Sequence, residues 1–127
     1  MTAAAVIAVA LLALLAVFQS ALALGAPWGQ AAWGGRHRRT LPAGLRLASA
    51  ATAVAACPLM ALYVLRSAEV IDAPPLPGAG AVAMWVLVGY FALGTLANLA
   101  SRSPRERFWG PAALALAVCC AVIALGA

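Results

Sequence analysis

The sequence predicts an all-α polytopic membrane protein: a compact antiparallel bundle of four transmembrane helices that forms a single domain over residues 1–127. Two observations carry this prediction. The chain is 66% hydrophobic and only 9% charged, with a mean hydropathy of +1.02, whereas a soluble domain has about 25% charged residues. The apolar residues also form four long runs, and the basic residues gather in two of the connections between them.

The four apolar runs are each long enough to cross a bilayer, which requires roughly 20 helical residues. We expect helices at about residues 2–24, 44–65, 80–100 and 104–126. The first run ends in Ala21-Leu22-Ala23, a sequence similar to a signal-peptidase site. Its beginning carries no positive charge, however, and it exceeds the roughly 7–15 apolar residues of a secretory signal, so we predict an uncleaved helix.

Local signals refine the second and fourth helices. Pro58 lies near the middle of the second helix and should kink it, because proline removes a backbone hydrogen bond. Ser103-Pro104-Arg105-Glu106 is typical of a capping box, in which Ser103 caps the exposed amides of the fourth helix and Glu106 reaches back. Pro111 follows about two turns later and should bend this helix.

The charges predict an orientation. All eight basic residues are arginines, and seven lie in the first and third connections, whereas the second connection carries Glu69 and Asp72. By the positive-inside rule, the first and third connections are cytoplasmic and both termini lie outside. The composition lacks lysine and is rich in alanine, glycine and arginine, which is typical of a GC-rich bacterial genome. We therefore predict the bacterial cytoplasmic membrane.

Tryptophans lie at the ends of the apolar runs, where the indole ring favours the interface between lipid and water. We predict four interface anchors: Trp28, Trp33, Trp85 and Trp109. The net charge of +5 does not indicate nucleic acid as a partner, because the arginines flank apolar runs and face anionic lipid headgroups there. The lipid bilayer is the expected partner, with a homo-oligomer or a partner membrane protein as further options.

The predicted helices contain no ionisable residue at mid-depth. Ion-coupled transporters usually place one there, and small multidrug exporters need a carboxylate in the first helix, so this absence argues against both classes. The chain also has no counterpart of the Gly-rich, Arg-bearing N-terminal motif of small fluoride channels. We find no catalytic motif, and His37, as the only histidine, makes a poor metal site. We therefore predict neither a metal nor a cofactor.

Polar residues instead concentrate at the predicted cytoplasmic ends of the helices. Gln19 and Asn98 lie at similar depth and are expected either to line a pocket or to make interhelical hydrogen bonds. The first connection, residues 25–35, is rich in glycine, and we expect it to fold back into the interface. The candidate polar or anion-binding site comprises Gln19, Arg36, His37, Arg46, Asn98, Ser101, Ser103, Glu106 and Arg107.

Guanidinium groups and exposed amides suit an anion such as a phosphate headgroup. The leading functional hypothesis is therefore a non-enzymatic accessory or binding protein whose cytoplasmic face contacts anionic lipid or a partner. The alternative is a small oligomeric transporter or channel, since four helices rarely enclose a pore alone. A membrane enzyme that acts on a lipid headgroup through His37 and Glu106 is a third hypothesis.

Several short motifs of the chain also resemble those of a known group of proteins. They are Gly25-x-Pro27-Trp28-Gly29, Trp33-Gly34-Gly35, Leu41-Pro42 with Arg46, and Asn98-x-x-Ser101-x-Ser103-Pro104-x-Glu106-Arg107-x-Trp109-x-Pro111. This pattern, which covers most of the chain, is similar to that of a group of small bacterial four-helix integral membrane proteins with no established activity. The resemblance implies fold and location only.

Overall fold

The computed structural model describes residues 2–37, 39–72 and 80–126, and this part of the chain is helical and contains no strand. Four helical stretches are long and apolar enough to cross a membrane. They span Thr2–Ala23, Ala43–Ser67, Ala81–Leu99 and Pro104–Gly126. The predicted all-α class with four such helices is therefore confirmed.

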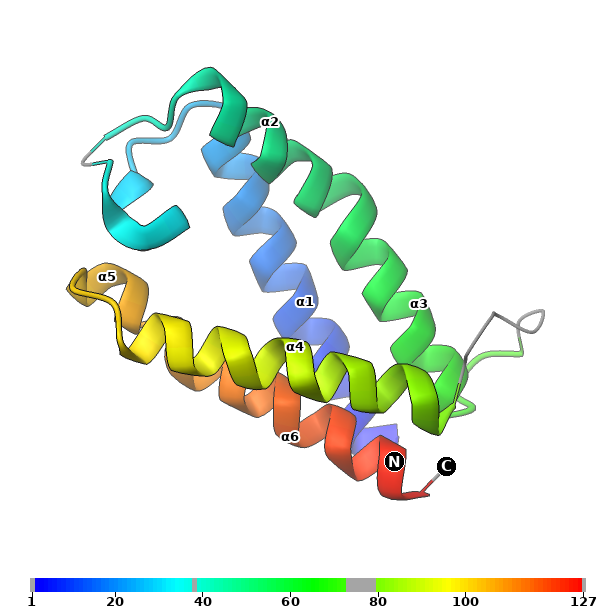
Figure 1. Ribbon diagram of the computed structural model, residues 1–127. Coiled ribbons are helices and arrows are strands. Elements are labelled where there is room, and N and C mark those ends of the chain that lie inside the picture. Colours follow the sequence, from blue (N-terminus) through cyan, green and yellow to red (C-terminus); the bar gives the residue numbers. More distant parts are fainter. Residues whose placement is uncertain (1, 38, 73–79, 127) are drawn as a thin grey trace.

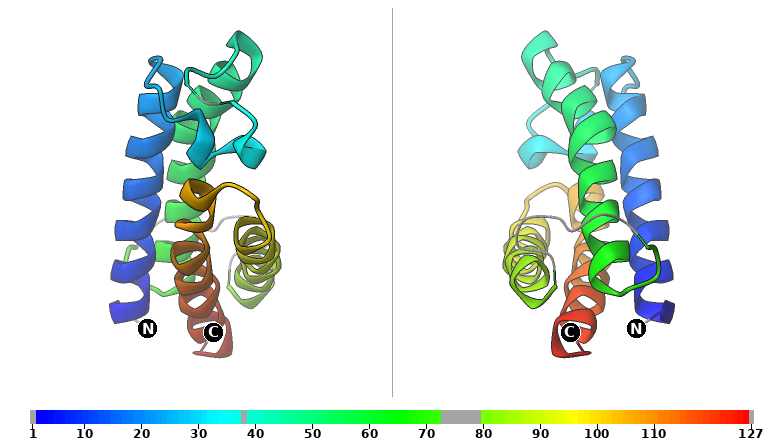
Figure 2. Two further views of the ribbon diagram at one scale, coloured as in Figure 1. Left: turned by 90° about the vertical axis from the view of Figure 1, so that its left-hand side faces the viewer. Right: turned by 90° about the vertical axis from the view of Figure 1, so that its right-hand side faces the viewer.

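The helices are arranged as two pairs (Figure 1). Helix α1 (Thr2–Ala23) packs on α2 (Ala43–Ala51) and α3 (Cys57–Ser67), and α4 (Ala81–Leu99) packs along α6 (Gly110–Gly126). Helix α6 lies between α1 and α4 (Figure 2). The pairs meet near the chain termini and diverge towards the end that holds the first and third connections, which we call the connection end.

The main buried cluster is formed by small and aliphatic side chains of all four stretches, and the cluster includes Ala8, Leu12, Val64, Met84 and Ile123. A second cluster at the connection end joins Leu22 of α1 to Ala32 and Leu41 of the first connection. The first connection therefore has its own buried apolar contacts with α1.

The second stretch departs from regular α-helix just before Pro58. A π-helical turn, η3 (Thr52–Ala56), separates α2 from α3, and the Cys57 amide donates to the Thr52 carbonyl five residues earlier. Proline has no amide hydrogen to continue the usual ladder, and π-helix occurs mostly as single turns of this kind inside α-helices. The irregularity predicted at Pro58 thus takes the form of a widened turn.

The fourth stretch is interrupted near Pro111. A short helix, α5 (Pro104–Arg107), is followed by a turn at Phe108 and Trp109, after which α6 begins at Gly110. A Cβ added at Gly110 would lie 2.5 Å from Leu99 Cδ2. Glycine at this position therefore lets α6 start directly against the end of α4.

Candidate functional site

The first connection folds into two 3-10 turns, η1 (Gly29–Ala31) and η2 (Trp33–Gly35), which lie between the two helix pairs (Figure 1). Trp33, Gly34 and Gly35 all have left-handed backbone angles, with φ of 50°, 84° and 71°. Gly29 is buried and donates its amide to the Arg39 carbonyl at 2.8 Å. The segment is therefore a compact, hydrogen-bonded unit, and its return into the membrane interface stays a prediction.

Three hydrogen bonds attach this connection to both helix pairs. The Trp33 indole Nε1 donates to the hydroxyl of Ser49 in α2 at 2.9 Å, and Ser49 is fully buried. The Gly34 amide donates to Glu106 Oε2 in α5 at 2.7 Å. The Ser103 hydroxyl donates to the Gln30 carbonyl. The connection thus bridges α2 on one side and α5 on the other.

The capping box is formed only in part. Ser103 Oγ accepts from the Glu106 amide at 3.4 Å, as predicted. Glu106, however, does not reach back to Ser103, whose amide donates to Ser101 Oγ at 3.1 Å. The carboxylate binds the Gly34 amide instead, because the left-handed turn presents that amide to it and a charge-assisted hydrogen bond favours a carboxylate that is only 7% exposed.

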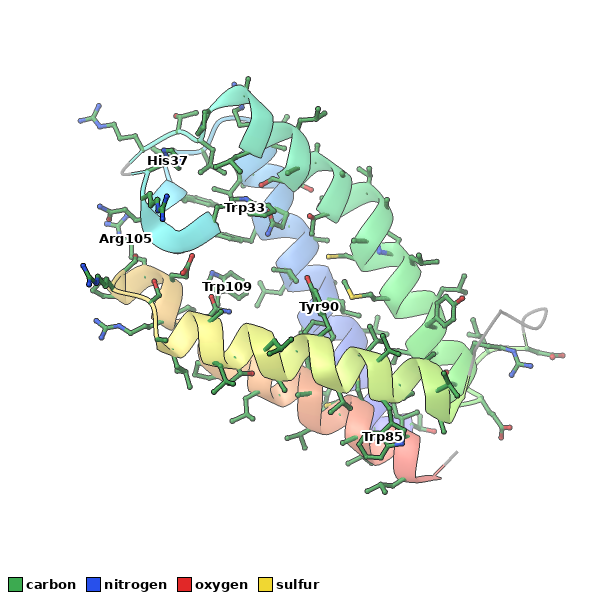
Figure 3. The ribbon with its side chains drawn as sticks, in the orientation of Figure 1. Trp33, His37, Trp85, Tyr90, Arg105 and Trp109 are labelled. Carbon is green, nitrogen blue, oxygen red and sulfur yellow. The ribbon has the colours of Figure 1, made fainter. Side chains whose placement is uncertain are left out.

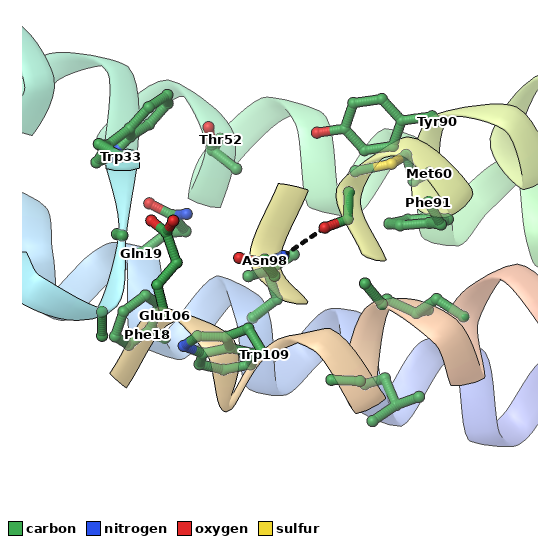
Figure 4. Close-up of a pocket in the computed structure, with 18 residues that line it drawn as sticks. Phe18, Gln19, Trp33, Thr52, Met60, Tyr90, Phe91, Asn98, Glu106 and Trp109 are labelled. Carbon is green, nitrogen blue, oxygen red and sulfur yellow. Dashed lines mark hydrogen bonds between the residues drawn. The ribbon is translucent and has the colours of Figure 1, made fainter. Parts of the chain in front are cut away.

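A cavity of about 230 Å³ lies between the helix pairs beside this bridge (Figure 4). In the close-up, Gln19, Trp33 and Glu106 lie towards one end of the cavity. Met60, Tyr90 and Phe91 lie towards the other end. The cavity is therefore polar at one end and apolar at the other.

One expectation for Gln19 and Asn98 was an interhelical hydrogen bond, and the structure shows a different arrangement. Asn98 Nδ2 donates to the Gly94 carbonyl of its own helix at 2.8 Å (Figure 4). Gln19 Oε1 is buried and has no hydrogen-bond partner among the described residues. Both side chains line the same cavity, which is the other expectation for this pair.

A polar groove adjoins the cavity at the connection end, and Asn98 and Glu106 line both. The groove is formed where the first connection meets the end of α4 and the start of α5. Its polar side chains are Gln30, Arg36, Asn98, Ser101, Arg102, Ser103 and Glu106. Arg36 and Arg102 come from connections that are distant in the sequence, and both are exposed.

Six of the nine candidate residues therefore line the cavity or the groove: Gln19, Arg36, Asn98, Ser101, Ser103 and Glu106. His37 and Arg107 line neither. Arg46 is also elsewhere, because its Nε donates at 3.0 Å to the Ala23 carbonyl at the end of α1. A cation suits the carbonyl end of a helix, so this position satisfies Arg46 without the site.

The sequence did not single out several residues that the structure adds. Arg102 and Gln30 belong to the groove, and Thr52 and Tyr90 to the cavity. Arg102 had a usable signal, since it shares the basic third connection with the predicted residues. Thr52 and Tyr90 had none, because their place depends on how far the helix pairs diverge.

The tryptophans have specific neighbours (Figure 3). Trp109 packs against Phe18 with ring centroids 4.8 Å apart, and Trp28 stacks on the same ring at 6.3 Å. Trp33 and Trp109 also line the cavity, whereas Trp85 lies near the opposite end of the molecule and is 48% exposed. Anchoring remains a prediction for all four, and two of them have a role in the cavity as well.

The geometry defines a helical protein with four apolar, membrane-length stretches, a partly open cavity and an arginine-bordered groove. Comparison with known protein families, with curated proteins and with solved structures finds no match. Within the described residues, no three of histidine, cysteine, aspartate and glutamate lie together as metal ligands. The groove and the cavity are therefore the features that bear on function.

Proposed function

We propose that the protein is a multi-pass protein of the bacterial cytoplasmic membrane. Its four long apolar stretches would form an antiparallel transmembrane bundle, with the first and third connections in the cytoplasm and both termini outside. This orientation is supported by seven arginines in or next to those two connections, and by Glu69 and Asp72 in the second. The groove and the open side of the cavity would then face the cytoplasmic leaflet.

Within that membrane, the protein acts as a non-enzymatic binding protein for lipid with an anionic phosphate headgroup. The observation that carries this proposal is the pair of arginines, Arg36 and Arg102, that two separate connections contribute to one groove. A guanidinium group can hold phosphate through two parallel hydrogen bonds, which a lysine cannot do. The hydroxyls of Ser101 and Ser103 line the same groove and offer further polar contacts.

The surroundings of the groove suit a lipid better than a soluble phosphate. A second, apolar hollow beside α5 is lined by Phe18, Trp28, Phe108 and Trp109, with Arg105 at its edge. Phe108 is 78% exposed, which favours lipid as its neighbour. Aromatic rings with a nearby arginine are typical of the level at which headgroups meet acyl chains.

Native mass spectrometry of the full-length protein, released from nanodiscs, tests this proposal. We expect retained phosphatidylglycerol but not phosphatidylcholine, and loss of the retained lipid in the double variant Arg36→Gln/Arg102→Gln. The matched control is Arg39→Gln/Arg107→Gln, which removes the same charge from the first connection and from α5 but not from the groove.

Equal lipid loss in the two double variants would show that only the overall charge matters and would contradict a groove site. Excess inorganic phosphate provides a further arm, because it should displace little lipid if acyl chains contribute to binding. Complete displacement would assign the groove to free phosphate instead of lipid.

A further inference from the structure

The cavity has a chemical character different from that of the groove. None of the described residues that line it is basic, and its polar end is formed by Gln19, Asn98 and Glu106. The donors of this end are partly engaged, since Asn98 Nδ2 already binds its own helix. Among the described residues that line the cavity, Glu106 is the only one with a charged side chain.

Glu106 is the central feature of this end. It is 7% exposed, and among the described residues its carboxylate has one hydrogen bond, from the Gly34 amide to Oε2, and no ion pair. A buried carboxylate is normally paired with a cation or with several donors, because its transfer from water is costly. Oε1 thus remains available to a positively charged donor.

Gln19 adds a second acceptor. Its Oε1 is buried without a donor among the described residues, which leaves the cost of its desolvation uncompensated. The terminal torsion of glutamine is soft, so the amide can turn its oxygen towards the neighbouring cavity. A ligand with two or three N–H groups could then bind both Gln19 and Glu106.

The rest of the cavity suits the apolar part of such a ligand. Aromatic rings of Phe18, Trp33, Tyr90, Phe91 and Trp109 line it, and aromatic faces attract cations as well as hydrocarbon. Its volume of about 230 Å³ is below the roughly 300–1,000 Å³ of sites for drug-sized ligands. The occupant should therefore be small, with one ring or a short chain.

We propose that this cavity binds a small primary or secondary ammonium compound, with its charged nitrogen at Glu106 and Gln19 and its hydrocarbon towards Met60 and Phe91. This site adjoins the lipid groove but is proposed on different groups. The two share Asn98 and Glu106, but the groove relies on arginines and the cavity on a carboxylate.

The test uses three ligands of similar shape and different charge: 2-phenylethylammonium, neutral 2-phenylethanol and the 3-phenylpropionate anion. Binding to the purified full-length protein is followed by calorimetry and by the fluorescence of Trp33 and Trp109. We expect the cation to bind about tenfold or more tightly than the alcohol, and the anion to show no saturable binding. Equal affinity for cation and alcohol in the unaltered protein, or no saturable binding of the cation, would overturn the proposal.

Variants then locate the site. Glu106→Gln keeps an acceptor for the Gly34 amide but removes the charge, so we expect it to lower the cation's affinity to that of the alcohol. Glu69→Gln, an exposed carboxylate in the second connection, is the matched control and should change nothing. Unchanged cation binding in a folded Glu106→Gln protein would overturn the proposal.

A cavity-filling variant keeps the test independent of Glu106. Gly94 lines the cavity, and a Cβ added there would first meet Ala113 Cβ at 4.0 Å, so Gly94→Val fits locally and occupies ligand space. It should weaken the cation and the alcohol alike. Loss of lipid retention in Arg36→Gln/Arg102→Gln with intact cation binding would separate the two sites.

Discussion

Two adjacent glycines in η2 give a matched pair of substitutions that tests how the first connection is held. Gly34 and Gly35 both have left-handed backbone angles, with φ of 84° and 71°. A Cβ at Gly34 would meet no atom within 4 Å, whereas a Cβ at Gly35 would lie 2.5 Å from Ser103 Cβ at the start of α5. Alanine at the two positions therefore differs mainly in one contact between the connection and α5.

The expected magnitudes follow from this difference. Alanine at either position lowers the free energy of unfolding by about 1–2 kcal/mol, because its side chain disfavours a left-handed backbone. Gly35→Ala must in addition displace Ser103, and overpacking of this kind costs about 1–3 kcal/mol. We therefore expect Gly35→Ala to lower the free energy of unfolding by about 1–3 kcal/mol more than Gly34→Ala does.

Equilibrium unfolding in mixed micelles with increasing dodecyl sulfate, followed by tryptophan fluorescence, measures this difference. Gly89→Ala in α4, where an added Cβ also meets nothing within 4 Å, is a control that should be neutral or slightly stabilising, because alanine favours helix over glycine. Equal destabilisation by Gly34→Ala and Gly35→Ala would refute the close contact between the first connection and α5.

Three further substitutions test other contacts by the same unfolding assay. Trp33→Phe leaves the buried Ser49 hydroxyl without its indole partner and should lower the free energy of unfolding by about 1–3 kcal/mol. Adding Ser49→Ala should remove most of this loss of stability. An unchanged loss in the double variant would exclude this hydrogen bond. Arg46→Met should lower the free energy of unfolding by about 0.3–1 kcal/mol through loss of the cation at the end of α1. A stability equal to that of the parent would show that this contact does not stabilise the protein. The added methyl group of Gly110→Ala collides with Leu99 and should lower the free energy of unfolding by about 1–3 kcal/mol. The double variant with Leu99→Ala should recover stability. No recovery would show that the strain arises from another contact.

Composition and the length of the apolar runs were sufficient to predict four membrane-length helices, because both are properties of single segments. The N-cap at Ser103 is also local, and the structure contains it. The helices are irregular just before Pro58 and Pro111, where a kink and a bend were predicted. The second half of the capping box failed for a reason that is not local. Gly34 competes for the Glu106 carboxylate from 72 residues away, and no pattern in the chain signals that pairing.

The candidate site was predicted at the level of a layer but not of individual partners. The prediction placed Gln19, Asn98 and Glu106 in one polar layer, and all three line one cavity. It also included Arg46, whose depth is similar but whose side chain turns to the end of α1. Depth can be read from position along a helix, whereas the direction of a side chain depends on which neighbours surround that helix.

Direct contact between lipid phosphate and the groove is the central claim, and solid-state NMR can measure it. The protein, labelled with ¹⁵N at arginine, is placed in phosphatidylglycerol bilayers, and dephasing of the guanidinium signals by ³¹P reports close approach. We predict clear dephasing in the parent protein and in Arg39→Gln/Arg107→Gln, and markedly weaker dephasing in Arg36→Gln/Arg102→Gln. Dephasing that persists unchanged in Arg36→Gln/Arg102→Gln would contradict the account.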